Sequence, residues 1–176
     1  MTKPIIVIVL TSAVVIPAEL RAQAPDNSER DRPHGVEVTP YVSLGSEASS
    51  GLGTAVRWPL GARFSIELET EHRRAETNGF LSNVSVMYDL PSCGRLTPYV
   101  VAGIGIEPYS FAYQSPFGGV ATSAGTAVAV NAGGGVRVVG GSNWGMRTDA
   151  RWSNGIGWRA PERVRLYNGV TFTSGR

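Results

Sequence analysis

Arg63-Phe64-Ser65-Ile66-Glu67-Leu68-Glu69-Thr70-Glu71 is a segment in which apolar and polar residues alternate. The apolar residues Phe64, Ile66 and Leu68 share one side, and three carboxylates follow one another on the other side. A period of two is typical of a β-strand. A strand with a carboxylate face can lie on the surface of a soluble protein or can line the inside of a barrel. The other segments of the chain decide between these two interpretations.

The chain begins with the features of a secretory signal peptide. Lys3 precedes an apolar run over residues 4–18, and Ala22-Gln23-Ala24 has the small-x-small pattern of a signal-peptidase site. A membrane anchor is disfavoured because that run is shorter than the roughly 20 residues of a spanning helix. We therefore expect a cleaved signal peptide at 1–24, a flexible polar leader at 25–35 and one folded domain at 36–176.

Composition indicates β structure with many tight turns. The chain has 22 glycines, 42% hydrophobic residues and only 17% charged residues. Its net charge of +2 is too small to indicate nucleic-acid binding. Cys93 is the only cysteine, and no cluster of Cys, His and Asp has metal-ligand spacing. We therefore expect no internal disulfide, no metal and no cofactor.

Eight alternating segments follow one another, separated by residues that are typical of turns. They cover residues 36–44, 51–58, 64–71, 81–90, 99–107, 127–139, 144–152 and 164–172. Eight strands close a small barrel, and about ten residues suffice for a tilted strand to cross a membrane.

The two faces of these segments differ in charge. Even-numbered residues form an almost uncharged, apolar face, whereas the odd-numbered face carries nearly all the charges. A soluble barrel would expose its charges and bury its apolar residues, and lipid requires the reverse. We therefore expect the odd face to line a salt-bridged lumen, since unpaired buried charges cost several kcal/mol each. The predicted lumen charge network contains Glu37, Arg57, Glu67, Glu69, Glu71, Asp89, Glu107, Arg137, Arg147, Asp149, Arg151 and Arg165.

The heights of these residues along the strands predict which of them meet. Glu67 is expected opposite Arg147, and Glu71 opposite Arg151. A periplasmic group and an outer pair are also expected: Glu37, Arg57, Asp89 and Arg137 in the first, and Glu107 with Arg165 in the second. Because side chains fill the interior of an eight-stranded barrel, no continuous pore is expected in the monomer.

Connections and aromatic residues favour an outer-membrane arrangement. Short turns at 59–62, 91–97 and 140–143 alternate with longer loops at 72–80, 108–126 and 153–163, although the loop at 45–50 is short. Five aromatic residues of the apolar face lie at the short-turn end, as in an interfacial girdle. These are Trp58, Phe64, Tyr88, Trp144 and Phe172.

Three segments resemble strands of the OmpA/OmpX-type family of small outer-membrane β-barrel domains. Residues 97–105, Thr-Pro-Tyr-Val-Val-Ala-Gly-Ile-Gly, look like the family's Pro-Tyr-x-x-x-Gly-x-Gly strand, and residues 131–137 and 144–152 look like the next two strands. The similarity spans most of 36–172 and implies an eight-stranded antiparallel up-and-down transmembrane barrel in the outer membrane. Barrels of this family usually end on an aromatic residue, whereas this chain continues past Phe172.

The sequence argues against catalysis. Ser153-Asn154-Gly155 is similar to the His-x-Ser-Asn segment of outer-membrane lipid A deacylases, but Arg151 replaces the histidine and cannot act as a general base. The histidines His34 and His72 are not placed by the sequence to activate Ser153. We expect a non-enzymatic barrel with a structural or surface-interaction role. Two alternatives stay open: a lipid A-modifying enzyme, and a soluble lipocalin-like barrel that binds a small ligand.

The expected surroundings are outer-membrane lipid and lipopolysaccharide, and the barrel is expected to be a monomer. Arginines of the outer loops would face lipopolysaccharide phosphates; they are Arg73, Arg74, Arg159 and Arg163. The loop at 108–126 is the predicted contact for a surface partner because it contains Tyr109, Phe111, Tyr113 and Phe117.

Overall fold

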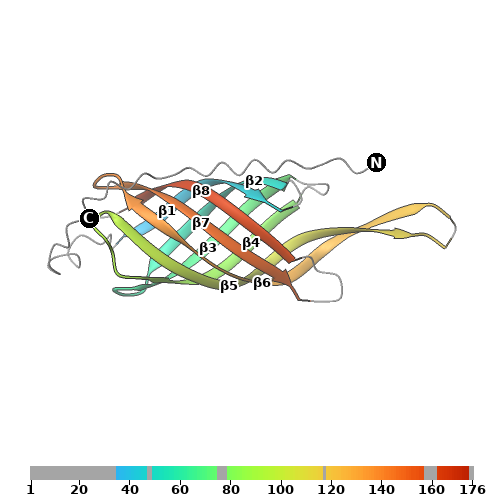
Figure 1. Cartoon of the computed structure of the whole chain (residues 1–176), viewed down its shortest axis with the longest axis horizontal. Coiled ribbons are helices and arrows are strands. Elements are labelled where there is room, and N and C mark those ends of the chain that lie inside the picture. The colour runs from blue at the N-terminus through green and yellow to red at the C-terminus, as the bar shows by residue number, and fades with distance from the viewer. Residues whose placement is uncertain (1–34, 47–48, 75–78, 117, 157–161, 175–176) are drawn as a thin grey trace.

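The structure is an eight-stranded antiparallel β-barrel (Figure 1). This computed structural model describes residues 35–46, 49–74, 79–116, 118–156 and 162–174. The strands are β1 (Val36–Gly45), β2 (Ser49–Pro59), β3 (Phe64–Arg74), β4 (Gly79–Asp89), β5 (Leu96–Gln114), β6 (Val120–Val139), β7 (Trp144–Gly155) and β8 (Glu162–Ser174). Each strand pairs with its neighbours in the sequence, and β8 returns to β1 to close the barrel. Among the described residues, no helix is long and apolar enough to span a bilayer.

The predicted segments correspond one to one with these strands. Seven of the eight lie wholly within an observed strand, and the fourth extends one residue beyond β4, to Leu90. The predicted signal peptide at 1–24 lies outside the described residues, as do residues 25–34 of the predicted leader. Only the last residue of the leader, Gly35, is described. The all-β fold and the up-and-down topology expected from the sequence are therefore confirmed.

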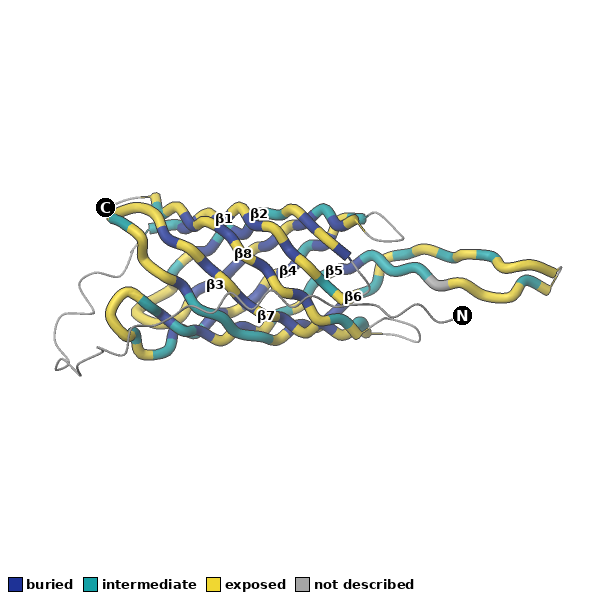
Figure 2. Tube along the Cα trace, turned by 45° about the horizontal axis from the view of Figure 1, so that its top comes forward, coloured by how far each residue is buried: buried dark blue, intermediate teal, exposed yellow. Residues whose placement is uncertain are grey.

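The connection at 108–126 was expected to be a loop, and this expectation is wrong. β5 continues to Gln114 and β6 begins at Val120, and the two remain paired from Pro108↔Thr126 to Gln114↔Val120. The resulting hairpin projects far beyond the rest of the barrel along its long axis (Figures 1 and 2). Pro108 does not end the strand, because the N–H that proline lacks is not needed at this position. Even-numbered residues of β5 direct their backbone N–H and C=O groups toward β4, and β4 pairs with β5 only as far as Ile106.

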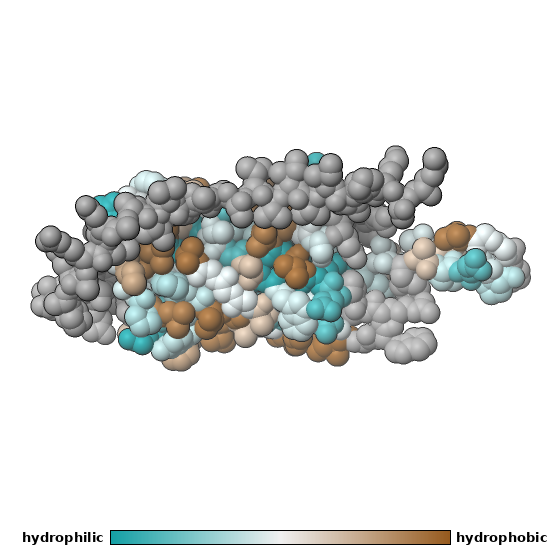
Figure 3. Space-filling view, viewed as in Figure 1, coloured by the Kyte–Doolittle hydropathy of each residue, from teal (hydrophilic) through white to brown (hydrophobic). Residues whose placement is uncertain are grey.

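Burial follows residue parity along every strand, as Figure 2 shows by its alternating colours. All buried residues of the described chain have odd numbers, and they include seven carboxylates and six arginines. The large exposed apolar residues of the barrel wall are almost all even-numbered, such as Leu52, Leu68 and Ile104. Apolar side chains accordingly appear across the visible outer wall in Figure 3. The barrel therefore has a charged, filled lumen and an apolar exterior.

Candidate functional site

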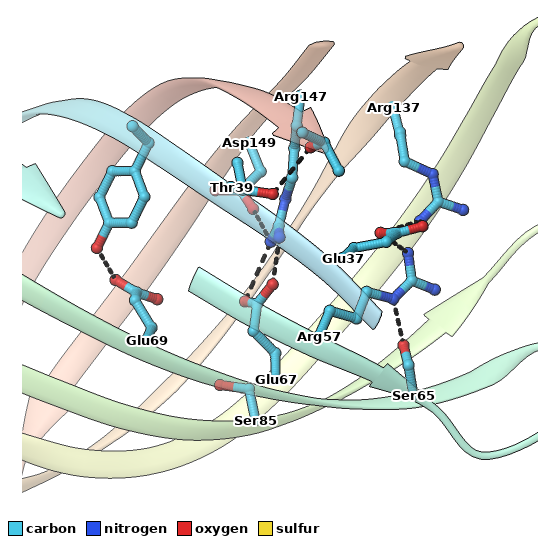
Figure 4. Close-up of polar contacts among 12 residues, drawn as sticks. Glu37, Thr39, Arg57, Ser65, Glu67, Glu69, Ser85, Arg137, Arg147 and Asp149 are labelled. Atoms are coloured by element: carbon cyan, nitrogen blue, oxygen red, sulfur yellow. Dashed lines mark hydrogen bonds and ion pairs between the residues drawn. The ribbon is translucent and has the colours of Figure 1, made fainter. Parts of the chain in front are cut away.

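Glu67 of β3 lies at the centre of the lumen and accepts hydrogen bonds from two arginines of β7. Arg147 binds both carboxylate oxygens, with its Nη2 3.1 Å from Oε1 (Figure 4). Arg151 donates from Nη2 to Oε1 at 2.6 Å. The Glu67 side chain is fully buried, so its charge would be strongly destabilising without these partners. β3 and β7, on opposite sides of the barrel, are thus joined across the lumen.

Two tyrosines complete the hydrogen bonds of these arginines. The Tyr99 hydroxyl donates to Asp149 at 2.6 Å and accepts from Arg147 Nε at 2.7 Å. The Tyr167 hydroxyl accepts from Arg147 at 2.5 Å and also from Arg151. Its ring lies 5.0 Å from the Arg151 guanidinium carbon, within cation–π range. Both tyrosines have the inward, odd parity, which is the signal that identifies them, but the predicted network contains charged residues only.

Four charged side chains form a closed ring at the short-turn end. Asp89 Oδ2 accepts from Arg57 at 2.7 Å and from Arg137 at 3.1 Å. Glu37 Oε2 lies 3.3 Å from Arg57 and 3.0 Å from Arg137 (Figure 4). The ring therefore connects β1, β2, β4 and β6 through ion pairs alone. These four residues are the ones that the sequence assigned to the periplasmic group.

Ion pairs at the long-loop end differ from those expected. Glu71 accepts from Arg165 at 2.6 Å, whereas Arg151, its expected partner, binds Glu69 at 2.7 Å. Glu107 lies 3.8 Å from Arg163 rather than beside Arg165. The reason is the shear of the barrel, which displaces opposite strands along the axis, so equal counts from the strand ends do not give equal heights. All twelve predicted lumen residues are nevertheless buried.

Arg73 is a lumen residue, contrary to its prediction as a loop arginine facing lipopolysaccharide. β3 extends to Arg74, which gives Arg73 inward parity and buries it, with Nε 3.5 Å from Glu71 Oε1. Arg74 is exposed, and Arg159 lies outside the described residues. The apolar–polar alternation of the sequence ends at Leu68, because Thr70, His72 and Arg74 are polar, so this pattern did not predict that the strand continues to Arg74.

The middle of β5 and β6 presents small residues to the lumen. Gly103, Gly105, Gly133 and Gly135 have inward parity. A Cβ added to Gly133 would meet the Ala150 carbonyl oxygen and would lie 2.9 Å from the Arg151 Cα and 3.0 Å from its Cγ. Asn83 of the neighbouring strand β4 is buried, and neither polar atom of its side chain has a partner among the described residues. Gly133 thus leaves room for Arg151, whereas Gly103 and Gly105 lie against Ser85 and Asn83 of β4.

The five aromatic residues predicted as a girdle all lie on the outside of the barrel at the short-turn end. Phe64 pairs across strands with Tyr88, and their ring centroids are 4.9 Å apart. Trp144 pairs with Phe172 at the junction of β7 and β8. Tyr88 is half-buried, and the other four residues are exposed. Their role at a membrane interface stays a prediction.

The projecting hairpin, residues 108–126, has no charged residue. At its base, Arg163 Nη1 of β8 donates to the Pro108 carbonyl at 2.9 Å. Higher up, a Cβ at Gly125 would lie 2.8 Å from the Tyr109 hydroxyl, so the Tyr109 ring lies over this glycine. The hairpin is therefore anchored to the barrel at its base, and it carries aromatic residues on one face opposite small ones.

Among the described residues, Ser153 has no histidine beside it that could act as a general base. It is buried on the inner face of β7, and its neighbours across strands are Asn131 and Arg163. His72 lies on the outer face of β3, where its ring packs 5.0 Å from Phe80, and His34 lies outside the described residues. Within the described residues, no group of His, Cys, Asp and Glu could hold a metal ion.

Comparison with solved structures places this architecture among known folds. The N-terminal β-barrel domain of Pseudomonas aeruginosa OprF matches with a TM-score of 0.66 and 17% identity, covering 80% of this chain and 98% of that one. Neisserial surface protein A (NspA) matches with a TM-score of 0.59 and 13% identity, covering 79% and 96%. The fold is that of the small outer-membrane β-barrels. No family model matches the sequence, and no curated protein matches it.

The outer-membrane β-barrel fold does not define an activity by itself. A designed transmembrane β-barrel matches this chain as well as NspA does, with a TM-score of 0.59 and 11% identity, covering 81% of this chain and 98% of the design. The fold therefore leaves the function of this chain open.

Proposed function

We propose that this chain is a non-enzymatic, integral outer-membrane β-barrel protein that acts in surface interactions through its projecting hairpin. The observation that carries the proposal is the inverted distribution of side chains, with paired charges inside and apolar residues outside. Water would disfavour the exposed apolar wall, whereas the hydrocarbon of a bilayer suits it. A soluble lipocalin-like barrel would need the opposite arrangement and an open interior for its ligand.

Membrane fractionation tests this proposal. The full chain, expressed in a Gram-negative host, should be recovered with the outer membrane and should resist extraction by urea. Its mobility on a gel should change when the sample is boiled, because a folded barrel stays compact in detergent until it is heated. Recovery in the soluble periplasmic fraction without detergent would reject the proposal.

Export through a cleaved signal peptide is part of the proposal. Removal of residues 1–24 would leave a mature chain that begins at Pro25, and the mass of the purified membrane protein measures this directly. Within the membrane, the barrel is proposed to be a monomer in contact with lipid and lipopolysaccharide. Exposed Arg74, at the long-loop end of β3, is the described arginine best placed for lipopolysaccharide phosphates.

A comparison of lipid A tests the absence of catalysis. Ser153 is the residue that a deacylase mechanism would require, and Ser153→Ala removes its hydroxyl. Lipid A from cells that express wild type, Ser153→Ala or neither protein should have the same acyl chains by mass spectrometry. Loss of an acyl chain in the wild type alone would replace the proposed role with an enzymatic one.

A further inference from the structure

Among the described residues, no strand pairs with either edge of the projecting hairpin. Backbone hydrogen bonds within the barrel show which residues direct their N–H and C=O groups toward these edges. Ser115 N donates to Gly119 O, so odd-numbered residues join β5 to β6 in this ribbon. Ile156 N donates to Val128 O, so even-numbered residues of β6 direct their backbone groups toward the β7 side. The pairing of β6 with β7 ends at Ala129. Even-numbered residues from Val120 to Thr126 thus present N–H and C=O groups that no described strand pairs.

The two edges are not protected equally. On the β5 edge, Pro108 occupies an outward-directed position, where it removes a donor and obstructs the approach of another strand. The β6 edge, Val120-Ala121-Thr122-Ser123-Ala124-Gly125-Thr126, has no proline, no charge and no interruption of its one-to-one register. Charges, prolines and bulges are the usual protection of exposed strand edges. The β6 edge is therefore a free edge that can accept another strand.

We propose that the β6 edge of the hairpin pairs with the same edge of a second copy of this chain located in an opposing membrane. The inference rests on the proposed function, because it requires barrels that present their hairpins from a membrane surface. The partner would add a strand by backbone hydrogen bonding, and the joined hairpins would form a four-stranded sheet.

The sequence of the edge is complementary to itself in one antiparallel register. A two-fold axis at Ser123 pairs Val120 with Thr126 of the second copy and Thr122 with its Ala124. All the outward-directed residues then form hydrogen-bonded pairs, each exchanging two bonds. No charge is brought against a like charge, and β-branched residues lie beside one another on one face. An isologous contact of this kind closes after two copies.

The direction of the hairpin selects an opposing membrane over the same membrane. Two barrels with the same orientation in one bilayer would bring their β6 edges together as parallel strands. Antiparallel pairing requires the second β6 strand to run in the opposite direction, so its barrel lies beyond the far end of the first hairpin. Because the hairpin extends along the long axis of the barrel (Figure 1), this end-to-end arrangement keeps the two barrels apart.

Cross-linking tests the register. Opposite residues of a non-hydrogen-bonded antiparallel pair have Cα atoms about 4.5 Å apart, within disulfide range. In a Cys93→Ser background, Ser123→Cys should therefore give a disulfide-linked dimer when vesicles carrying the protein are mixed under oxidising conditions. Ala121→Cys is the matched control, because position 121 lies opposite Gly125 of the second copy. At least fivefold less dimer is expected from this control. Equal yields from both variants, or no dimer from either, would overturn the proposal.

Vesicle clustering tests the opposing-membrane geometry. Phosphatidylcholine vesicles that carry the full chain should cluster, as measured by energy transfer between two labelled populations. Ala124→Pro removes an outward N–H from the β6 edge and should reduce clustering at least fivefold, whereas Ala112→Pro on the β5 edge should leave it unchanged. Heat-dependent gel mobility shows that each variant is folded.

Clustering only with protein-free vesicles that contain lipopolysaccharide would overturn the proposal in favour of saccharide binding. Dispersed vesicles of a folded, membrane-inserted wild type would reject the pairing and leave the proposed barrel function intact.

Discussion

Arg147 and Glu67 lie on opposite walls of the barrel and form two hydrogen bonds across its centre. Each residue also has other partners, because Glu67 accepts from Arg151 and Arg147 donates to Asp149. The pair is therefore part of a network in which the loss of one charge leaves several others without compensation.

Substitution Glu67→Gln should destabilise the barrel strongly. It keeps the size of the side chain but leaves two buried arginines short of a countercharge, which typically costs about 3–5 kcal/mol. Urea unfolding of the folded barrel in lipid vesicles measures this free energy. The control is Glu162→Gln, which changes an exposed carboxylate that accepts from Trp152 Nε1 at 2.6 Å and should cost less than about 1.5 kcal/mol. Equal losses in both variants would show that the lumen charges are not coupled.

The absence of a side chain at Gly133 should be required by the close approach of β7. Gly133→Ala places a methyl group against the Ala150 carbonyl oxygen and against the Cα and Cγ of Arg151, and overpacking of this kind costs about 1–3 kcal/mol. Gly61→Ala, in a turn where a Cβ would meet nothing within 4 Å, should change stability by less than about 0.5 kcal/mol. The temperature at which gel mobility changes compares the two. A Gly133→Ala barrel as stable as wild type would contradict the tight fit of the lumen.

A charge on the outer wall should reveal the position of the bilayer. Val84 is exposed near the middle of β4, and Val84→Arg should cost about 2–4 kcal/mol in lipid vesicles. Leu60→Arg, in the exposed turn between β2 and β3, should cost at most about 1 kcal/mol because it lies beside the headgroups. If urea unfolding gives the same small change for both, the wall is not embedded in hydrocarbon.

The hairpin should be dispensable for folding. Replacement of residues 108–126 by Asn-Gly joins Glu107 to Ala127, which face each other across β5 and β6, through a tight two-residue turn. The shortened protein should insert into vesicles and keep its heat-dependent mobility, with stability within about 1 kcal/mol of wild type, because an isolated two-stranded ribbon contributes little. A variant that no longer inserts would show that the hairpin serves the fold.

Residue parity was sufficient to predict the barrel and the direction of its charges. The alternation of Ile66 and Leu68 with Glu67 and Glu69 defines one strand, and seven other segments share the same parity. The parity of a residue does not depend on where its strand begins or ends, so errors of a few residues in the predicted bounds do not change the face on which the residue lies. For this reason, all twelve predicted lumen residues are buried even though most strand bounds shifted.

Partners within the lumen could be predicted only in part. Glu67 meets Arg147 and the four residues of the periplasmic group meet one another, as expected, whereas the partners at the long-loop end differ. Shear sets which residues of opposite strands reach the same height, and no local pattern encodes it. Glu71 therefore meets Arg165 rather than Arg151. The hairpin was missed at Pro108, where the predicted segment stops at Glu107 and a loop was expected, although proline is compatible with a strand edge where no donor is needed. The alternation of Tyr109 and Tyr113 with smaller residues was the available signal.

The ring of Glu37, Arg57, Asp89 and Arg137 connects β1, β2, β4 and β6, and this has a consequence for assembly. Residues so distant in the sequence can pair only when the sheet from β1 to β6 has curled far enough to bring β1 opposite β6. An incomplete sheet in a bilayer would present unpaired charges to hydrocarbon, at a large cost. Intermediates with a few inserted strands should consequently be too unstable to accumulate. Insertion and closure should then occur together, as one cooperative event.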